Sequence, residues 1–89
     1  MKNLKEFRAR LDKIDEQLQD LLNQRASIAL EIGKEKCKDK SPVFYCPERE
    51  AEILEAVVKR NKGPISDTDL LDIYKKIMAV CLALQSHQT

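Results

Sequence analysis

The chain has 89 residues, which is enough for one small domain, expected to occupy residues 1–89. Its 16 Lys and Arg residues balance 15 Asp and Glu residues, which argues against a nucleic acid or an anionic membrane as the main partner. No apolar run approaches the ~18 residues needed to cross a bilayer, and the charged N-terminal stretch does not resemble a signal peptide.

The cysteines number three, at Cys37, Cys46 and Cys81, without a CxxC spacing. We therefore expect reduced thiols and a cytoplasmic protein. A zinc site built from these cysteines and His87 is the weaker alternative on this spacing, so no metal is expected.

Residues 4–36 are predicted to form one long helix, capped by Asn3 and ending before Pro42. Its apolar residues recur in steps of three and four, which is the heptad spacing of a helix packed lengthwise on other helices. These residues, called the seam below, are Leu4, Phe7, Leu11, Ile14, Leu18 and Leu21.

Two cations interrupt the continuation of this seam. Arg25 takes the next position, and Lys36 follows it by 11 residues. At about 100° per residue, this spacing comes within about 20° of full turns, so both side chains lie on one face. Fixed positive charge on a face that should be buried indicates a binding site.

The length of this helix predicts an obligate homodimer. It would be about 50 Å long, whereas a compact monomer of this size is only about 30 Å across. Its apolar seam would stay exposed to solvent unless a second copy covered it, so we expect the long helices to pair across a two-fold axis.

Two shorter helices are predicted to complete an all-α fold of three helices per chain. One begins at Pro47 and stops at Asn61–Gly63, with Gly63 as a left-handed cap. The other begins at Ser66 or Asp67, and its apolar second half should be the most enclosed part of the chain.

The loop between the first two helices is expected to fold back on the core through Val43, Phe44 and Tyr45.

Four cations are candidates for a shared pocket: Arg8, Arg25, Lys36 and Arg49. Arg8 and Arg25 lie about 25 Å apart along the helix and on different faces, but antiparallel pairing would bring Arg8 of one chain to Arg25 and Lys36 of the other. Because arginine binds carboxylates in a bidentate manner, a small dicarboxylate is the implied ligand. The alternatives are a surface ion pair for Arg8, a structural interhelical pair for Arg25 and a helix-dipole contact for Lys36.

The other side chains offer little conventional catalytic chemistry. The single histidine, His87, is expected to be solvated in the tail, and there is no Gly-rich phosphate loop. An enzyme with these residues would suit an intramolecular rearrangement, driven by preorganised charge and conformational restraint without a cofactor.

Three segments together resemble the all-helical chorismate mutase family across nearly the whole chain. They are FRARLDKIDEQLQDLLNQRASIALEIGKEK, PEREAEIL and IYKKIMAVCLALQ. The resemblance implies conversion of chorismate to prephenate, a step of phenylalanine and tyrosine biosynthesis, by an intertwined helical dimer without a cofactor.

The resemblance also implies roles for individual residues. Arg25 and the partner subunit's Arg8 would bind the two carboxylates, while Lys36 and Gln85 would donate hydrogen bonds to the ether oxygen. Glu50 would accept a hydrogen bond from the ring hydroxyl, and Arg49 would order that region.

Two binding positions depart from the family pattern. Cys46 stands where members often carry an aspartate, in a loop one residue longer than usual, and Cys81 replaces a common serine. A thiol is a weaker hydrogen-bond donor than a hydroxyl, but neither change removes a cation, so activity is expected to persist.

Three other interpretations remain. An isochorismate pyruvate lyase uses similar helices on a similar substrate. A non-catalytic regulatory or dimerisation module would tolerate Arg25→Ala, and a plain coiled-coil adaptor would carry Leu or Ile at position 25.

Overall fold

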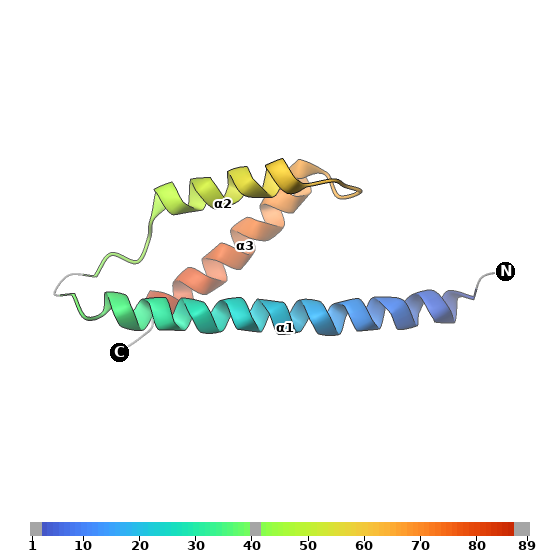
Figure 1. Cartoon of the computed structure of the whole chain (residues 1–89), viewed down its shortest axis with the longest axis horizontal. Helices are drawn as coiled ribbons and strands as arrows, with labels where there is room; N and C mark the ends of the chain where they lie inside the picture. Colours follow the sequence, from blue (N-terminus) through green and yellow to red (C-terminus); the bar gives the residue numbers. More distant parts are fainter. Residues whose placement is uncertain (1–2, 40–41, 87–89) are drawn as a thin grey trace.

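The computed structural model describes residues 3–39 and 42–86, and all regular structure within these ranges is helical. Helix α1 spans Leu4–Lys36, α2 spans Pro47–Arg60 and α3 spans Asp67–Ser86 (Figure 1). The prediction of an all-α fold with one long and two shorter helices is confirmed.

Helix α1 begins and ends where its sequence predicts. The side-chain oxygen of Asn3 accepts a hydrogen bond from the backbone N–H of Lys5 at 2.9 Å, which caps the first turn. At the other end, the Cys37 N–H donates to the carbonyl of Gly33 at 3.0 Å. Gly33 therefore lies inside the helix, where it is buried together with Ala29.

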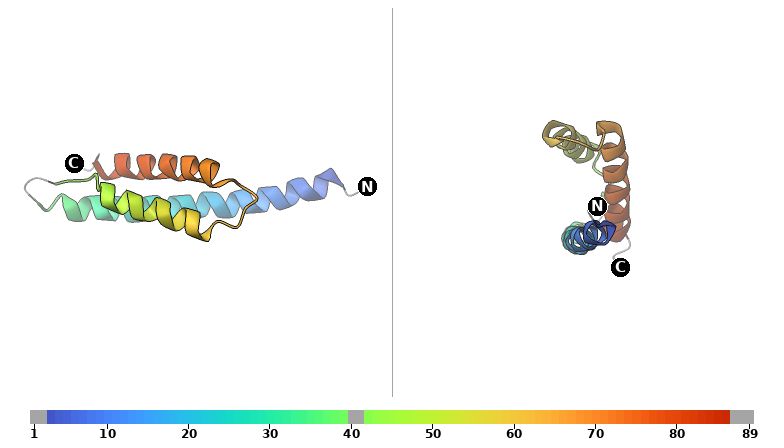
Figure 2. Two further views of the ribbon diagram at one scale, coloured as in Figure 1. Left: turned by 90° about the horizontal axis from the view of Figure 1, so that it is seen from above. Right: turned by 90° about the vertical axis from the view of Figure 1, so that its right-hand side faces the viewer.

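Helix α3 holds the chain together because it packs against both other helices, while α1 and α2 make no such contact with each other. Figure 2 shows α2 and α1 lying on different parts of α3. The small residues Ala29 and Gly33 allow α1 to approach α3, which contributes the buried Met78 and Cys81. Val80 remains 49% exposed, so only one face of the second half of α3 is enclosed within a single chain.

The start of α3 carries the predicted cap. The hydroxyl of Ser66 accepts a hydrogen bond from the Asp69 N–H at 3.1 Å, so Ser66 is the N-cap and the helix begins at Asp67.

The prediction that Gly63 caps α2 is wrong in position. The helix ends at Arg60, and Asn61 already leaves it in an extended conformation, with φ −71° and ψ 123°. Gly63 does adopt the left-handed region, at φ +73°, but two residues further on. The reason is the side chain of Asn61, which accepts from the Gly63 N–H at 3.0 Å and donates to the carbonyl of Ile65 at 2.9 Å.

The prediction for the loop before α2 is also wrong in part. Phe44 is half-buried, but Val43 and Tyr45 are 74% and 54% exposed. Successive side chains of an extended segment point in opposite directions, so only one of the three turns inward.

A single chain leaves much of α1 uncovered. The described structure measures 63 × 26 × 15 Å, with a radius of gyration of 16.7 Å. All residues from 3 to 24 are exposed, and the N-terminal half of α1 extends past the other helices (Figure 2). The six seam residues are 44–60% exposed, which is unusual for such a regular apolar stripe.

Over the described residues, none of the helices combines the length and hydropathy that a membrane span requires.

Candidate active site

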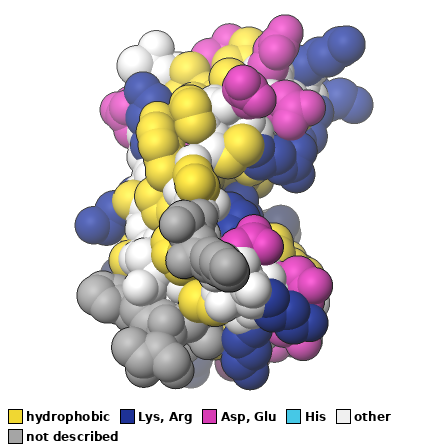
Figure 3. All heavy atoms as spheres, turned by 90° about the vertical axis from the view of Figure 1, so that its left-hand side faces the viewer, with side chains coloured by type: hydrophobic (Ala, Val, Ile, Leu, Met, Phe, Trp, Pro, Cys, Tyr) yellow, Lys and Arg dark blue, Asp and Glu magenta, His cyan; other side chains and the backbone are white. Residues whose placement is uncertain are grey.

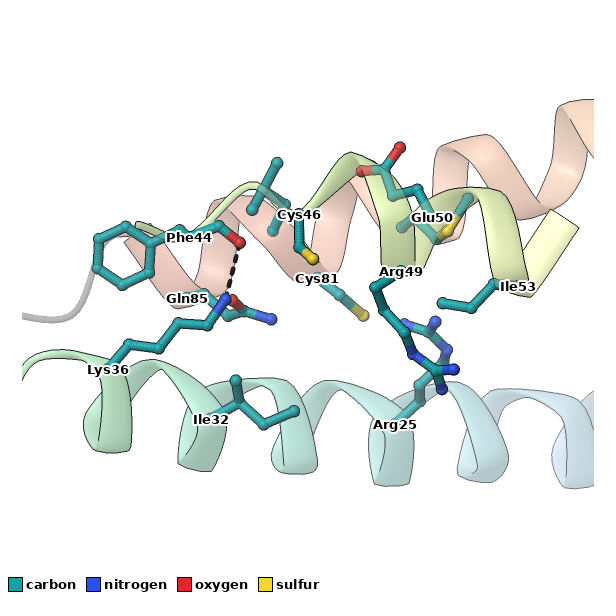
Figure 4. Close-up of a pocket in the computed structure, with 12 residues that line it drawn as sticks. Arg25, Ile32, Lys36, Phe44, Cys46, Arg49, Glu50, Ile53, Cys81 and Gln85 are labelled. Atoms are coloured by element: carbon teal, nitrogen blue, oxygen red, sulfur yellow. Dashed lines mark hydrogen bonds between the residues drawn. The ribbon is translucent and has the colours of Figure 1, made fainter. Parts of the chain in front are cut away.

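A cavity of about 300 Å³ lies between the C-terminal half of α1, the loop and first turns of α2, and the end of α3 (Figure 4). It is lined by Arg25, Ile32, Lys36, Phe44, Cys46, Arg49, Glu50, Ile53, Met78, Cys81, Leu82 and Gln85.

The structure brings together all but one of the residues predicted to bind or convert a ligand. Those in the cavity wall are Arg25, Lys36, Cys46, Arg49, Glu50, Cys81 and Gln85. Arg8 lies on the exposed N-terminal half of α1, about 25 Å along the helix axis from Arg25, and does not reach this cavity within one chain. Its expected contribution from a second chain stays a prediction.

The cavity is electropositive. Arg25 and Lys36 project from one face of α1 with Ile32 between them, as their spacing predicts, while Arg49 approaches from α2 (Figure 4). Arg25 and Lys36 are partly buried. Glu50 is the single carboxylate in the wall, so three cations face one anion over the described residues. The space therefore suits a ligand with more than one negative charge.

Lys36 is held in place by the loop before α2. Its Nζ donates a hydrogen bond of 2.9 Å to the backbone carbonyl of Phe44. An ammonium group has three N–H donors, so this contact fixes its position and leaves donors for a ligand. Sequence reasoning missed Phe44 as a site residue, because a backbone acceptor leaves no signal in the side-chain pattern.

Gln85 carries an unsatisfied polar atom. Its Oε1 is buried, and no hydrogen-bond partner for it exists in the part of the chain that the structure describes. Gln85 projects toward the cavity from α3, and Lys36 projects toward it from α1 (Figure 4). An orphaned buried acceptor costs about 1–3 kcal/mol, and such groups are typical of sites that function at the expense of stability.

The remaining wall is sulfur and hydrocarbon. Cys46 is exposed at the N-cap of α2, where its side chain makes no capping bond. Cys81, only 5% exposed, lines the interior with Met78 and Leu82. Four apolar residues were not predicted to line the site: Ile32, Ile53, Met78 and Leu82. Ile32 could have been found, because it lies between Arg25 and Lys36 on the same face of α1.

The described residues contain no group of three or more His, Cys, Asp or Glu side chains arranged to hold a metal ion. His87, which figured in the zinc alternative and in the predicted solvated tail, lies outside the described residues.

Comparison with known proteins agrees with this geometry. The family model described as chorismate mutase type II matches residues 7–86. The chain is 40% identical over 86 residues to the bifunctional chorismate mutase/prephenate dehydratase of Stutzerimonas stutzeri, covering 92% of this chain and 24% of the relative. The corresponding protein of Aquifex aeolicus is 42% identical over 89 residues, covering 96% and 24%. The chain thus spans about a quarter of the length of the curated relatives that it matches.

Solved structures show the same arrangement of helices. Chorismate mutase from Helicobacter pylori in complex with prephenate matches with a TM-score of 0.82 at 35% identity, covering 93% of this chain and 89% of that one. Form II of chorismate mutase from Thermus thermophilus matches with a TM-score of 0.90 at 27% identity, covering 96% of each chain. The fold and the comparisons define an all-helical domain of the chorismate mutase type. The chain belongs to the chorismate mutase type II family, which confirms the resemblance found in its sequence.

Proposed function

We propose that this chain catalyses the intramolecular rearrangement of chorismate to prephenate. The observation that carries the proposal is the cavity in which Arg25, Lys36 and Arg49 outnumber the single carboxylate of Glu50. Chorismate is a dicarboxylate with an ether oxygen and a ring hydroxyl, so side chains in this space complement one carboxylate, the ether oxygen and the hydroxyl, and the second carboxylate is left to the partner subunit's Arg8. The Helicobacter pylori relative holds prephenate, the product of the reaction.

Arg25 binds one substrate carboxylate through its planar pair of N–H donors. The partner subunit's Arg8 binds the other. Fixing both ends of the substrate selects the folded conformer in which the carbon atoms that form the new bond approach each other, which removes part of the entropic barrier.

Lys36 and Gln85 act on the bond that breaks. As the carbon–oxygen bond of the ether opens, negative charge grows on its oxygen, and the Lys36 ammonium and the Gln85 amide N–H donate to it. Because the Phe44 carbonyl already positions Lys36, this stabilisation requires little reorganisation when the transition state forms. No cofactor, nucleophile or proton transfer is needed for this step.

Glu50 accepts a hydrogen bond from the ring hydroxyl and so orients the ring. Arg49, paired with Glu52 at 3.7 Å, orders the start of α2. Cys46 and Cys81 contact the substrate, with the thiol of Cys81 as a weak donor.

The proposed active unit is a homodimer with antiparallel α1 helices. It is supported by the exposed seam and by the position of Arg8, which is remote from the cavity of its own chain. A cytoplasmic location stays a prediction, based on the number and spacing of the cysteines.

The test is the loss of chorismate absorbance on adding the purified chain. Arg25→Ala and Lys36→Ala should each lower kcat/KM at least about 100-fold, which is typical of removing a preorganised transition-state donor. Lys34→Ala is the matched control, because Lys34 is an exposed α1 lysine outside the cavity, and it should retain activity.

Isochorismate should be supplied in parallel. Turnover of isochorismate alone, or no turnover of either substrate by the wild-type chain, would contradict the proposed function.

A further inference from the structure

The segment between α1 and α2 turns one of its two sides toward the protein. Pro42 and Phe44 are half-buried, whereas Val43 and Tyr45 are exposed. Side chains of an extended segment point alternately to opposite sides, so the even-numbered positions face inward and the odd-numbered ones face solvent. The inward side brings Phe44 into the cavity wall, at the end of the cavity where Lys36 leaves α1 (Figure 4).

Residues 42–45 have few other attachments. Among the described residues, no backbone hydrogen bond ties this segment to a helix. The hydrogen bond of 2.9 Å from Lys36 Nζ to the Phe44 carbonyl does join it to α1. Every residue carries a carbonyl group, so the position of this one depends on what anchors the segment. The half-buried ring of Phe44 is the anchor that belongs to the same residue.

The helix dipole does not explain why Lys36 makes this contact. A cation in the last turn of α1 is stabilised by the negative end of the helix, but the exposed Lys34 already supplies one there. Lys36 is instead partly buried and meets a carbonyl of the loop. With one donor used in this way, its ammonium group keeps two donors for a ligand.

The contact lies beyond the partner's α1 in the proposed dimer. If Arg8 of one chain lies opposite Arg25 of the other, the partner's α1 begins opposite Ala29. Lys36 is seven residues further along the helix, about 10 Å past that point. The contact between Lys36 and Phe44 is therefore made within one chain, in a place that the partner's α1 does not occupy.

We infer that Phe44 is a positioning residue for the proposed reaction, because its ring anchors the carbonyl that holds the Lys36 ammonium group. This inference rests on the proposed function. Phe44 acts through Lys36, whose donation to the ether oxygen strengthens as negative charge grows there. Loss of the anchor therefore lowers kcat, while KM, which depends on the arginines that bind the carboxylates, stays nearly the same.

The test compares three variants of the full chain. Phe44→Ala should lower kcat about tenfold with KM within about twofold of the wild-type value, since a small displacement of a catalytic group is costly. Phe44→Leu should restore most of the loss, because it keeps an apolar anchor. Val43→Ala is the matched control. It shortens the neighbouring side chain, which is 74% exposed, and should change neither value.

A double-mutant cycle separates positioning from a structural role. In the Lys36→Ala background, Phe44→Ala should lower kcat by less than about twofold, because the lysine that it positions is gone. An equal loss in both backgrounds, or a rise in KM alone, would overturn the proposal. Unfolding of Phe44→Ala at the assay temperature would overturn it too, because the ring would then hold the fold itself.

A second measurement does not depend on catalysis. NMR relaxation of the lysine ammonium groups should show Lys36 as more restricted than Lys34 in the wild type, and as freer in Phe44→Ala. A wild-type chain that does not convert chorismate would refute the proposed function, while this comparison would still decide whether Phe44 holds Lys36. Equal motion of Lys36 in the two proteins would refute the positioning role.

Discussion

Gln85 carries a buried acceptor without a hydrogen-bond partner among the described residues, in the wall of the cavity that Lys36 also lines. Replacing it with Met keeps the size of the side chain and removes the amide. We expect kcat/KM to fall about 100-fold with the lost donor, while the free energy of unfolding stays unchanged or rises by about 1 kcal/mol because the orphaned acceptor is gone.

Urea unfolding and steady-state kinetics check both parts of this expectation. Gln24→Met is the matched control, since the exposed Gln24 amide only donates to Asp20 at 2.8 Å, and neither value should change much. If the free energy of unfolding of Gln85→Met fell by as much as the activation free energy for kcat/KM rose, Gln85 would have a structural role.

The cations of the site were predictable from the sequence because helical geometry is regular. The 11-residue spacing of Arg25 and Lys36 predicts that both lie on one face of α1, and in the structure both line the same cavity. The contact between Lys36 and the Phe44 carbonyl was not predictable, because any residue at position 44 offers the same backbone oxygen.

At the scale of elements, the sequence predicted where helices begin because capping depends on a few local side chains. Asn3 and Ser66 cap α1 and α3 as expected. Loops have neither caps nor a periodic pattern. The exposure of Val43 and Tyr45 was therefore not predictable from the sequence. The hydrogen bond from the Gly63 N–H to the Asn61 side chain, which fixes the α2–α3 loop, was not predictable either.

Gly63 provides a prediction for the α2–α3 loop. Its φ is +73°, and a Cβ built on it meets nothing within 4 Å, so substitution has only a backbone cost. Gly63→Ala should lower the free energy of unfolding by about 1–2 kcal/mol, and Gly63→Asn by less, since Asn tolerates the left-handed region. Thermal unfolding measures both, and an Ala variant as stable as the wild type would contradict the assigned conformation.

At the scale of the whole molecule, α1 reaches beyond the rest of its own chain and exposes its apolar seam (Figure 2). The space-filling view in Figure 3 shows hydrophobic and charged side chains exposed together at the end of the molecule near the loop before α2. The length of α1 and its heptad spacing predicted that the seam would be exposed in a single chain. A single sequence cannot show how a second copy packs, so the paired helices remain a proposal.

Leu18 tests that proposal. If Arg8 of one chain lies opposite Arg25 of the other, the two-fold axis passes between positions 16 and 17, and each Leu18 lies near its copy. Leu18→Glu would then bury two like charges, so sedimentation should report a monomer without activity. Gln19→Glu adds the same charge at an exposed position off the seam and should remain an active dimer. A fully active dimer of Leu18→Glu would refute this register.

The sharing of one site by two chains is tested most directly by mixing Arg8→Ala with Arg25→Ala. Each variant alone should be inactive, because every site would lack one arginine. After refolding together in equal amounts, half of the dimers should be mixed, and each should hold one complete site, so about a quarter of wild-type activity should return. A mixture that stays inactive while its chains demonstrably exchange would contradict a shared site.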